Sequence, residues 1–318
     1  MYLYRHKVKR NFLFVSVMLM LHLHSFSQTD MDGILMNKNY LCSGFTYEYS
    51  GWTNYWEGTE KRINQNLGNV TATAYAVMTN YGVTDRLNII AGLPYIQTKA
   101  SAGQMHAMNG IQDITLSVKY ALLQKHLQKG LLSVMLIGGY STPVTNYPSD
   151  FLPLSIGSGS TKLLGRIIGD YQLKNWFTTI SATYICQNNI RIDRPAYYTT
   201  TMHYSNEVQM PDAVQYNLRA GLRSDKWIVE IVGNNQTTLG GFDISKNNMP
   251  FPSNRMNSTT LGLHFKYVTA FLPELSFIGS SDYTIAGRNV GQATYYSTGV
   301  FYAFTFKQAR KASPSKTT

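Results

Sequence analysis

Apolar and polar residues alternate along much of this chain with a period of two. The stretch YGVTDRLNIIAGLPYIQTK, at residues 81–99, gives the clearest example. Successive side chains of a β-strand point to opposite faces, so this period predicts a strand. One face would carry Leu87, Ile89, Ala91, Leu93 and Tyr95, and the other Asn88, Ile90, Gly92 and Pro94.

The same alternation recurs and predicts an all-β chain of about twelve strands. They are expected at residues 41–51, 69–81, 86–98, 111–123, 131–142, 161–173, 175–187, 213–223, 226–238, 257–269, 274–286 and 294–306. The connections between them are tight and long in turn. The tight ones lie at 82–85, 124–130, 174, 224–225 and 270–273, and the long ones at 52–68, 99–110, 143–160, 188–212, 239–256 and 287–293.

These connections separate two classes of protein that share the period of two. A soluble β-sandwich and a transmembrane β-barrel both have one apolar and one polar strand face. Outer-membrane barrels have short periplasmic turns and longer extracellular loops, whereas a sandwich has no reason to keep that asymmetry. The sequence therefore predicts a transmembrane antiparallel up-and-down β-barrel over residues 41–306, located in the cell outer membrane.

The composition agrees with a membrane environment. Aromatic residues make up 13% of the chain, with 23 Tyr, while charged residues reach only 14%, against roughly 25% in soluble domains. Tyr and Trp combine an apolar ring with a polar tip, which suits a membrane interface, and Trp176 and Trp227 each follow a tight turn. The basic residues form no patch interleaved with aromatic residues, so we expect no nucleic-acid partner.

The N-terminus has the features of a secretory signal peptide. A basic stretch precedes the apolar run FLFVSVMLML, and small residues before Gln28 form a plausible cleavage site. The apolar run is shorter than the about 20 residues that a helix needs to span a bilayer. We expect a signal peptide at 1–27, a short periplasmic lead at 28–40 and a disordered basic tail at 307–318. A small plug is the alternative for 28–40.

Two neighbouring stretches resemble a known family. NYGVTDRLNIIAGLPYIQTKA and GIQDITLSVKYALL, within residues 80–123, are similar to the outer-membrane barrels of the "MetA-pathway of phenol degradation" family. In that family a Gly-x-Thr-Asp turn precedes a GLPY-like strand and then a G-x-x-D strand ending in K-Y. The resemblance implies an outer-membrane barrel linked to passage of aromatic or other hydrophobic compounds. Its motifs are structural and name no catalytic residue.

The polar strand faces carry a set of charged residues that a barrel would direct into its lumen. They are Glu48, Asp113, Lys119, Lys162, Arg166, Asp170, Arg219, Arg223, Glu230, His264, Lys266 and Asp282. One interpretation is a solute path whose mixed charges set conductance, with a slight basic excess that favours anionic solutes. The other is an ion-pair network that fills a narrow barrel, because buried charges are tolerated only when paired.

One stretch suggests an enzyme. MHYSNE contains His203 and Ser205, and it resembles the His-x-Ser-Asn element of outer-membrane phospholipase A, with His203 as base and Ser205 as nucleophile. Glu207 stands where that family has Gly, and the stretch falls in a long loop. We therefore expect no enzyme. The dispersed His residues form no metal-site spacing, and we expect no metal and no cofactor.

The predicted function is a channel or transporter for small molecules, including hydrophobic or aromatic ones. The alternatives are a structural or surface-interaction barrel with a plugged lumen and, third, a lipid hydrolase. The expected partners are outer-membrane lipid, a small-molecule solute and the barrel assembly machinery. The last strand, TYYSTGVFYAFTF, resembles the C-terminal strand that this machinery recognises, although a tail follows Phe306 here.

Overall fold

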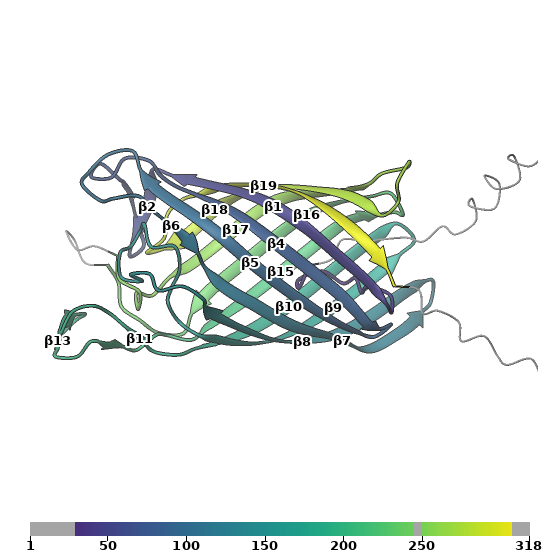
Figure 1. The fold of residues 1–318 in the computed structure, drawn as a ribbon, viewed down its shortest axis with the longest axis horizontal. Coiled ribbons are helices and arrows are strands. Elements are labelled where there is room, and N and C mark those ends of the chain that lie inside the picture. Colours follow the sequence, from purple (N-terminus) through teal and green to yellow (C-terminus); the bar gives the residue numbers. More distant parts are fainter. Residues whose placement is uncertain (1–28, 245–249, 307–318) are drawn as a thin grey trace, which may run out of the picture.

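The computed structural model describes residues 29–244 and 250–306, which form a closed antiparallel β-barrel (Figure 1). Each long strand pairs with the next long strand along the chain, and the first pairs with the last. The barrel strands are β1 (Tyr40–Trp52), β4 (Val70–Thr84), β5 (Leu87–Ala100), β7 (Asp113–Leu127), β8 (Gly130–Pro143), β9 (Lys162–Leu173), β10 (Trp176–Gln187), β15 (Ala213–Arg223), β16 (Trp227–Thr238), β17 (Asn257–Val268), β18 (Leu275–Arg288) and β19 (Thr294–Thr305). The predicted twelve-stranded barrel is confirmed.

The turns predicted at residues 82–85 and 124–130 are shorter in the structure, because the strands before them continue further. β4 continues to Thr84 through an irregularity after Gly82, and β7 continues to Leu127 after a bulge near Ala121. A bulge places an extra residue in one strand and breaks the alternation of faces, so the pattern appeared to end early. The β7–β8 turn is only residues 128–129, with Gln128 at a φ of 54°.

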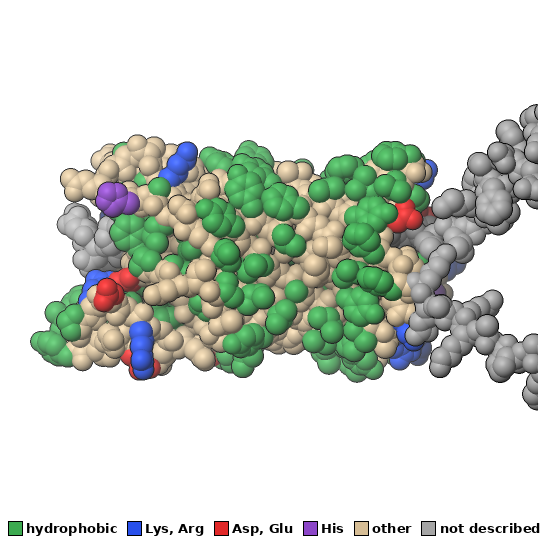
Figure 2. Space-filling model, in the orientation of Figure 1, with side chains coloured by type: hydrophobic (Ala, Val, Ile, Leu, Met, Phe, Trp, Pro, Cys, Tyr) green, Lys and Arg blue, Asp and Glu red, His purple; other side chains and the backbone are tan. Residues whose placement is uncertain are grey.

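The strand faces are divided as the alternation predicted. On β5, Asn88 and Ile90 point inward and are buried, whereas Ile89 and Leu93 point outward and are exposed. Figure 2 shows hydrophobic side chains along the outer wall, with charged side chains gathered toward the two ends of the barrel. Such a surface matches the apolar band of an outer-membrane barrel. No helix in the described part of the chain is long and apolar enough to cross a bilayer.

The long connections hold further short strands that the sequence pattern did not reveal. Strands of two to four residues are too short to show a period. They are β2 (Asn54–Glu57) with β3 (Glu60–Ile63), β6 (Met108–Ile111) on β5, β11 (Ile190–Arg191) with β14 (Glu207–Val208), and β12 (Tyr197–Tyr198) with β13 (Met202–His203). The predicted signal peptide at 1–27 and the predicted tail at 307–318 lie outside the described residues.

The division of faces predicts that a new charge destabilises the barrel more at an outward-facing position than at an inward-facing position of the same strand. Val300 points outward from β19, and Ser297 points inward on the same strand, opposite Glu48. We expect Val300→Lys to destabilise the folded protein by about 2–4 kcal/mol, because its ammonium would lie in hydrocarbon. The Lys of Ser297→Lys would lie beside Glu48 and should cost less than about 1 kcal/mol.

The measurement is the free energy of unfolding of both variants in lipid vesicles with a denaturant. The folded fraction is read from the gel-mobility shift that a folded barrel shows. Equal destabilisation by Val300→Lys and Ser297→Lys would contradict the assignment of the outer face to lipid.

Candidate functional site in the barrel lumen

The charged residues that the sequence singled out project from inward-facing strand positions. Glu48, Arg219, Arg223, Glu230, His264 and Lys266 line a chamber of about 270 Å³ inside the barrel. Asp113, Lys119, Arg166 and Asp170 are buried on β7 and β9, where Lys162 shares their side of the sheet. Asp282 reaches the chamber through a contact with His264. Whether these residues form a solute path stays a prediction.

Residues 29–39 lie against these lumen side chains, in the segment for which a lead and a plug were both considered. The Lys119 ammonium donates hydrogen bonds to the Asp32 carboxylate at 2.9 Å and to the Asp32 carbonyl at 2.7 Å. The Arg166 guanidinium donates to the Asp30 carboxylate at 2.8 Å and to the Asp30 carbonyl at 2.7 Å. Because Lys119 and Arg166 are inward-facing and buried, these contacts place the segment within the lumen.

Apolar contacts anchor the same segment at the periplasmic end. Met36 is buried against Cys42 and Phe301 on β1 and β19. Leu35 packs against the buried cluster of Met135, Ile137 and Ile168 on β8 and β9, on the other side of the barrel. Gly33 passes so close to Asp170 that a Cβ on it would overlap the carboxyl group. The segment therefore bridges opposite walls of the barrel.

This segment separates two spaces within the barrel. A vestibule of about 730 Å³ at the periplasmic end is lined by Gly33, Leu35 and Asp225. The chamber of about 270 Å³ lies on the other side and is lined by Thr29, Asp32 and Met31. Ile34 and Arg223 border both spaces. Residues 29–36 and the wall residue Arg223 therefore lie between the two spaces.

Ion pairs hold most of the remaining lumen charges. Arg223 binds the Asp170 carboxylate at 3.1 Å and lies over the Phe177 ring, 3.9 Å from its centroid. Between the adjacent strands β15 and β16, Arg219 binds Glu230 at 2.8 Å. His264 lies 3.0 Å from the Asp282 carboxylate and 3.8 Å from that of Glu230. Pairing of this kind offsets the cost of removing charge from bulk water.

Loop 144–161 folds into the extracellular mouth. The Tyr147 hydroxyl donates a hydrogen bond to the inward-facing Asp113 carboxylate at 2.5 Å. The Thr98 hydroxyl, also inward-facing, donates to the Leu154 carbonyl, and the Leu154 side chain is fully buried. Asp113 therefore anchors a loop in this structure, and the loop narrows the mouth.

Asn289 ties three further extracellular loops together. It has a φ of 53° and is buried. Its side-chain carbonyl accepts hydrogen bonds from the backbone N–H groups of Gly58 and Ile244, and its amide donates to Asp243. Hydrogen bonds from Arg288 and Asn289 lower the pKa of Asp243 to about 2, so its carboxylate stays ionised at acidic pH values where a free Asp takes up a proton.

The candidate hydrolase residues do not form a catalytic pair. The His203 ring shares a hydrogen bond of 2.9 Å with the Thr199 hydroxyl and stacks on Tyr197. The Ser205 hydroxyl accepts a hydrogen bond from the Glu207 N–H. A serine nucleophile needs its base within hydrogen-bond reach, and no such contact joins His203 to Ser205 in the described structure.

Sequence reasoning did not identify Asp30, Asp32, Tyr147 or Asn289. The first two had a usable signal, because DMDG supplies two carboxylates directly after the predicted cleavage site in a basic chain. Tyr147 and Asn289 lie in loops, where no period indicates which way a side chain points. Their partners are distant in sequence, and only the closed barrel brings them together.

Comparisons with known proteins extend the resemblance of residues 80–123 to most of the chain. The sequence model of a family described as "Putative MetA-pathway of phenol degradation" matches residues 62–297. No curated protein matches the chain. Among solved structures, the COG4313 outer membrane channel from Pseudomonas putida F1 is similar with a TM-score of 0.67 and 14% identity, over 88% of this chain and 100% of that one.

Two other similar structures have lower scores. The translocator domain of the autotransporter NalP from Neisseria meningitidis has a TM-score of 0.48 and 13% identity, over 86% of this chain and 90% of its own. The NanC porin has a TM-score of 0.44 and 10% identity, over 83% of this chain and 100% of its own. The family match covers more than half of the residues, and the Pseudomonas structure has the same fold. The chain therefore belongs to the "MetA-pathway of phenol degradation" family and is a β-barrel of the cell outer membrane.

Proposed function

We propose that this protein is a channel for small organic anions with an apolar body, and that residues 29–36 form a displaceable plug in its lumen. The observation that carries the proposal is the pair of contacts from Asp32 to Lys119 and from Asp30 to Arg166. Carboxylates of the chain itself occupy the two cationic positions. A solute with a carboxylate could take the same positions once the segment moves.

The chamber beside the plug supports this class of solute. Lys266 brings positive charge to its wall beside the ion-paired Arg219 and Arg223, and Met78 and Ile278 add apolar surface. A mixed lining of this kind suits a molecule with one charged group on an apolar skeleton. The phenol named in the family's description has such an apolar skeleton. We therefore keep an apolar body in the proposed solute.

The proposal predicts that conductance depends on the plug carboxylates. In the variant Asp30→Asn with Asp32→Asn, Lys119 and Arg166 lose their charged partners. A hydrogen bond to a charged group is worth about 1.5–3 kcal/mol. Removing two such contacts should therefore raise the open fraction about tenfold or more. The measurement is single-channel conductance of the mature protein in planar bilayers.

Glu60→Gln is the matched control, because Glu60 lies on an extracellular hairpin and its ion pair is with Arg62. It should conduct like the unchanged protein. If the double variant also keeps the original conductance while folding normally, residues 29–36 are not the barrier.

A further prediction concerns ion selectivity in the double-variant background. Glu48→Gln removes a negative charge from the chamber wall and should shift the reversal potential in a KCl gradient toward anions. Lys266→Gln should shift it toward cations, because the local potential determines which ion enters. An unchanged reversal potential in both variants would place these residues outside the ion path, and shifts in the same direction would contradict the predicted signs.

The second candidate is a structural or surface-interaction barrel with a permanently closed lumen. The loops joined at Asn289 and the anchoring of Met36 favour it. Flux into liposomes separates the two functions: the channel should pass benzoate faster than benzylamine and faster than a protein-free control. Flux of both solutes equal to that control, in the unchanged protein and in the double variant, would favour the closed barrel.

A further inference from the structure

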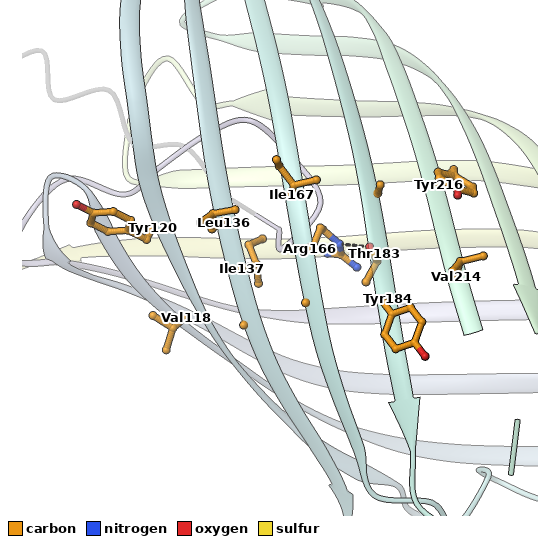
Figure 3. Close-up of a pocket in the computed structure, with 13 residues that line it drawn as sticks. Val118, Tyr120, Leu136, Ile137, Arg166, Ile167, Thr183, Tyr184, Val214 and Tyr216 are labelled. Carbon is orange, nitrogen blue, oxygen red and sulfur yellow. Dashed lines mark hydrogen bonds between the residues drawn. The ribbon is translucent and has the colours of Figure 1, made fainter. Parts of the chain in front are cut away.

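A pocket of about 690 Å³ lies among the extracellular loops at the end of β10. Residues of the connections 188–212 and 239–256 form most of its lining. Tyr184, which Figure 3 shows near the end of β10, borders the pocket as well. None of the lining residues also lines the chamber or the vestibule of the lumen, so this pocket is a separate site.

A small hydrophobic core gives the pocket firm walls. Ile190, Val208 and Met210 of one connection are buried in the same cluster as Phe251 of the other. Within the first connection, β11 pairs with β14 and β12 pairs with β13. Walls that are already packed do not have to be ordered by a ligand, which lowers the cost of binding.

Asp212 supplies a carboxylate to this pocket. One of its oxygens accepts a hydrogen bond from the Gln187 backbone N–H at 3.0 Å, and the other accepts one from the Tyr184 hydroxyl at 2.7 Å. These two bonds fix the carboxylate and leave each oxygen able to accept another donor. No Lys or Arg occurs among the described residues that line the pocket, so the negative charge of Asp212 has no cation beside it there.

The other polar groups of the lining are mainly acceptors. The Gln187 amide nitrogen already donates to the Pro211 carbonyl, and the Asn189 amide nitrogen donates to the Glu207 carboxylate at 2.8 Å. The two side-chain carbonyl oxygens remain free to accept. Ser253 is only 6% exposed and borders the pocket, and its hydroxyl has no hydrogen-bond partner among the described residues. A ligand in this pocket must therefore bring donors.

Apolar surface adjoins these acceptors. The rings of Tyr184 and Phe242 and the side chain of Leu239 border the same pocket. The face of an aromatic ring attracts a cation. A carboxylate or phosphate would instead be repelled by Asp212 and would find few donors. The lining therefore favours a cation that carries a small apolar body.

We propose that this pocket binds a primary amine with a small apolar body, and that the ammonium group binds the Asp212 carboxylate and the acceptor oxygens beside it. An ammonium group has three donors and no acceptor, which matches this lining. The apolar body lies against Leu239 and the neighbouring rings. The site does not depend on which solute the lumen passes.

The test compares three ligands that share a phenyl ring and differ in their polar group: 2-phenylethylamine, 2-phenylethanol and phenylacetate. Binding to the full mature protein in a neutral detergent is measured by equilibrium dialysis, with protein-free micelles as the blank. The amine should bind about tenfold or more tightly than the alcohol, because hydrogen bonds to an ionised donor are roughly twice as strong as neutral ones. Phenylacetate should not bind above the blank.

Two variants test the charge of the pocket. Asp212→Asn keeps the shape of the side chain, removes its charge and should lower the affinity for the amine about tenfold or more. Gln209→Lys leaves Asp212 in place and adds an ammonium group to the same lining, so it should also lower this affinity. The matched control is Asp150→Asn, because Asp150 pairs with Arg194 and does not line the pocket. The control should bind the amine like the unchanged protein.

Two outcomes would overturn the proposal. One is equal affinity of the unchanged protein for the amine and for the alcohol, since the charge of the ligand would then not matter. The other is equal affinity of Asp212→Asn and Asp150→Asn for the amine, provided that both show the gel-mobility shift of a folded barrel.

Discussion

The closed ring of backbone hydrogen bonds is the constraint on which the rest of this structure depends. Within hydrocarbon, a strand edge with unpaired N–H and C=O groups costs several kcal/mol per group, so only a closed sheet is viable. The pairing of β1 with β19 supplies that closure over twelve residue pairs, from Tyr40 with Thr305 to Gly51 with Thr294. Once the ring is closed, every strand has one face in lipid and one face in the lumen. Charged residues on the second face must then find partners within a confined space.

The confinement explains why the lumen is an ion-pair network as well as a candidate path. Lys119 is completely buried, and an unpaired ammonium there would be very costly. Asp32 satisfies it from a segment outside the strands. The solute path and the ion-pair network are therefore compatible interpretations of the charged residues. The network includes a segment that is not part of the barrel wall, so it can rearrange without breaking the barrel. The ion pair of Asp170 with Arg223 is different, because both residues belong to strands of the wall. This pair therefore stays in place when the N-terminal segment moves.

The two ends of the barrel are organised differently. At the extracellular end, loops reach one another through Asn289, and loop 144–161 turns inward onto Asp113. At the periplasmic end the turns are short, and the N-terminal segment does the closing through Met36 and Leu35. Long loops can fold over a lumen and short turns cannot, so the asymmetry in connection length also decides which element closes which end.

The alternation of side chains determined the strands, their faces and the environment of each face, because the two faces of a strand in a barrel meet different solvents and the residues must match. It failed only where a bulge broke the period, as near Ala121, or where a strand was too short to have one, as in β11 to β14. The tertiary structure alone decided which lumen charges meet. Asp32 and Lys119 are 87 residues apart, and Asp30 and Arg166 are 136 apart. No local pattern encodes contacts between residues so far apart in sequence. These contacts follow from the curvature of the closed sheet and from the path of a segment that belongs to no strand.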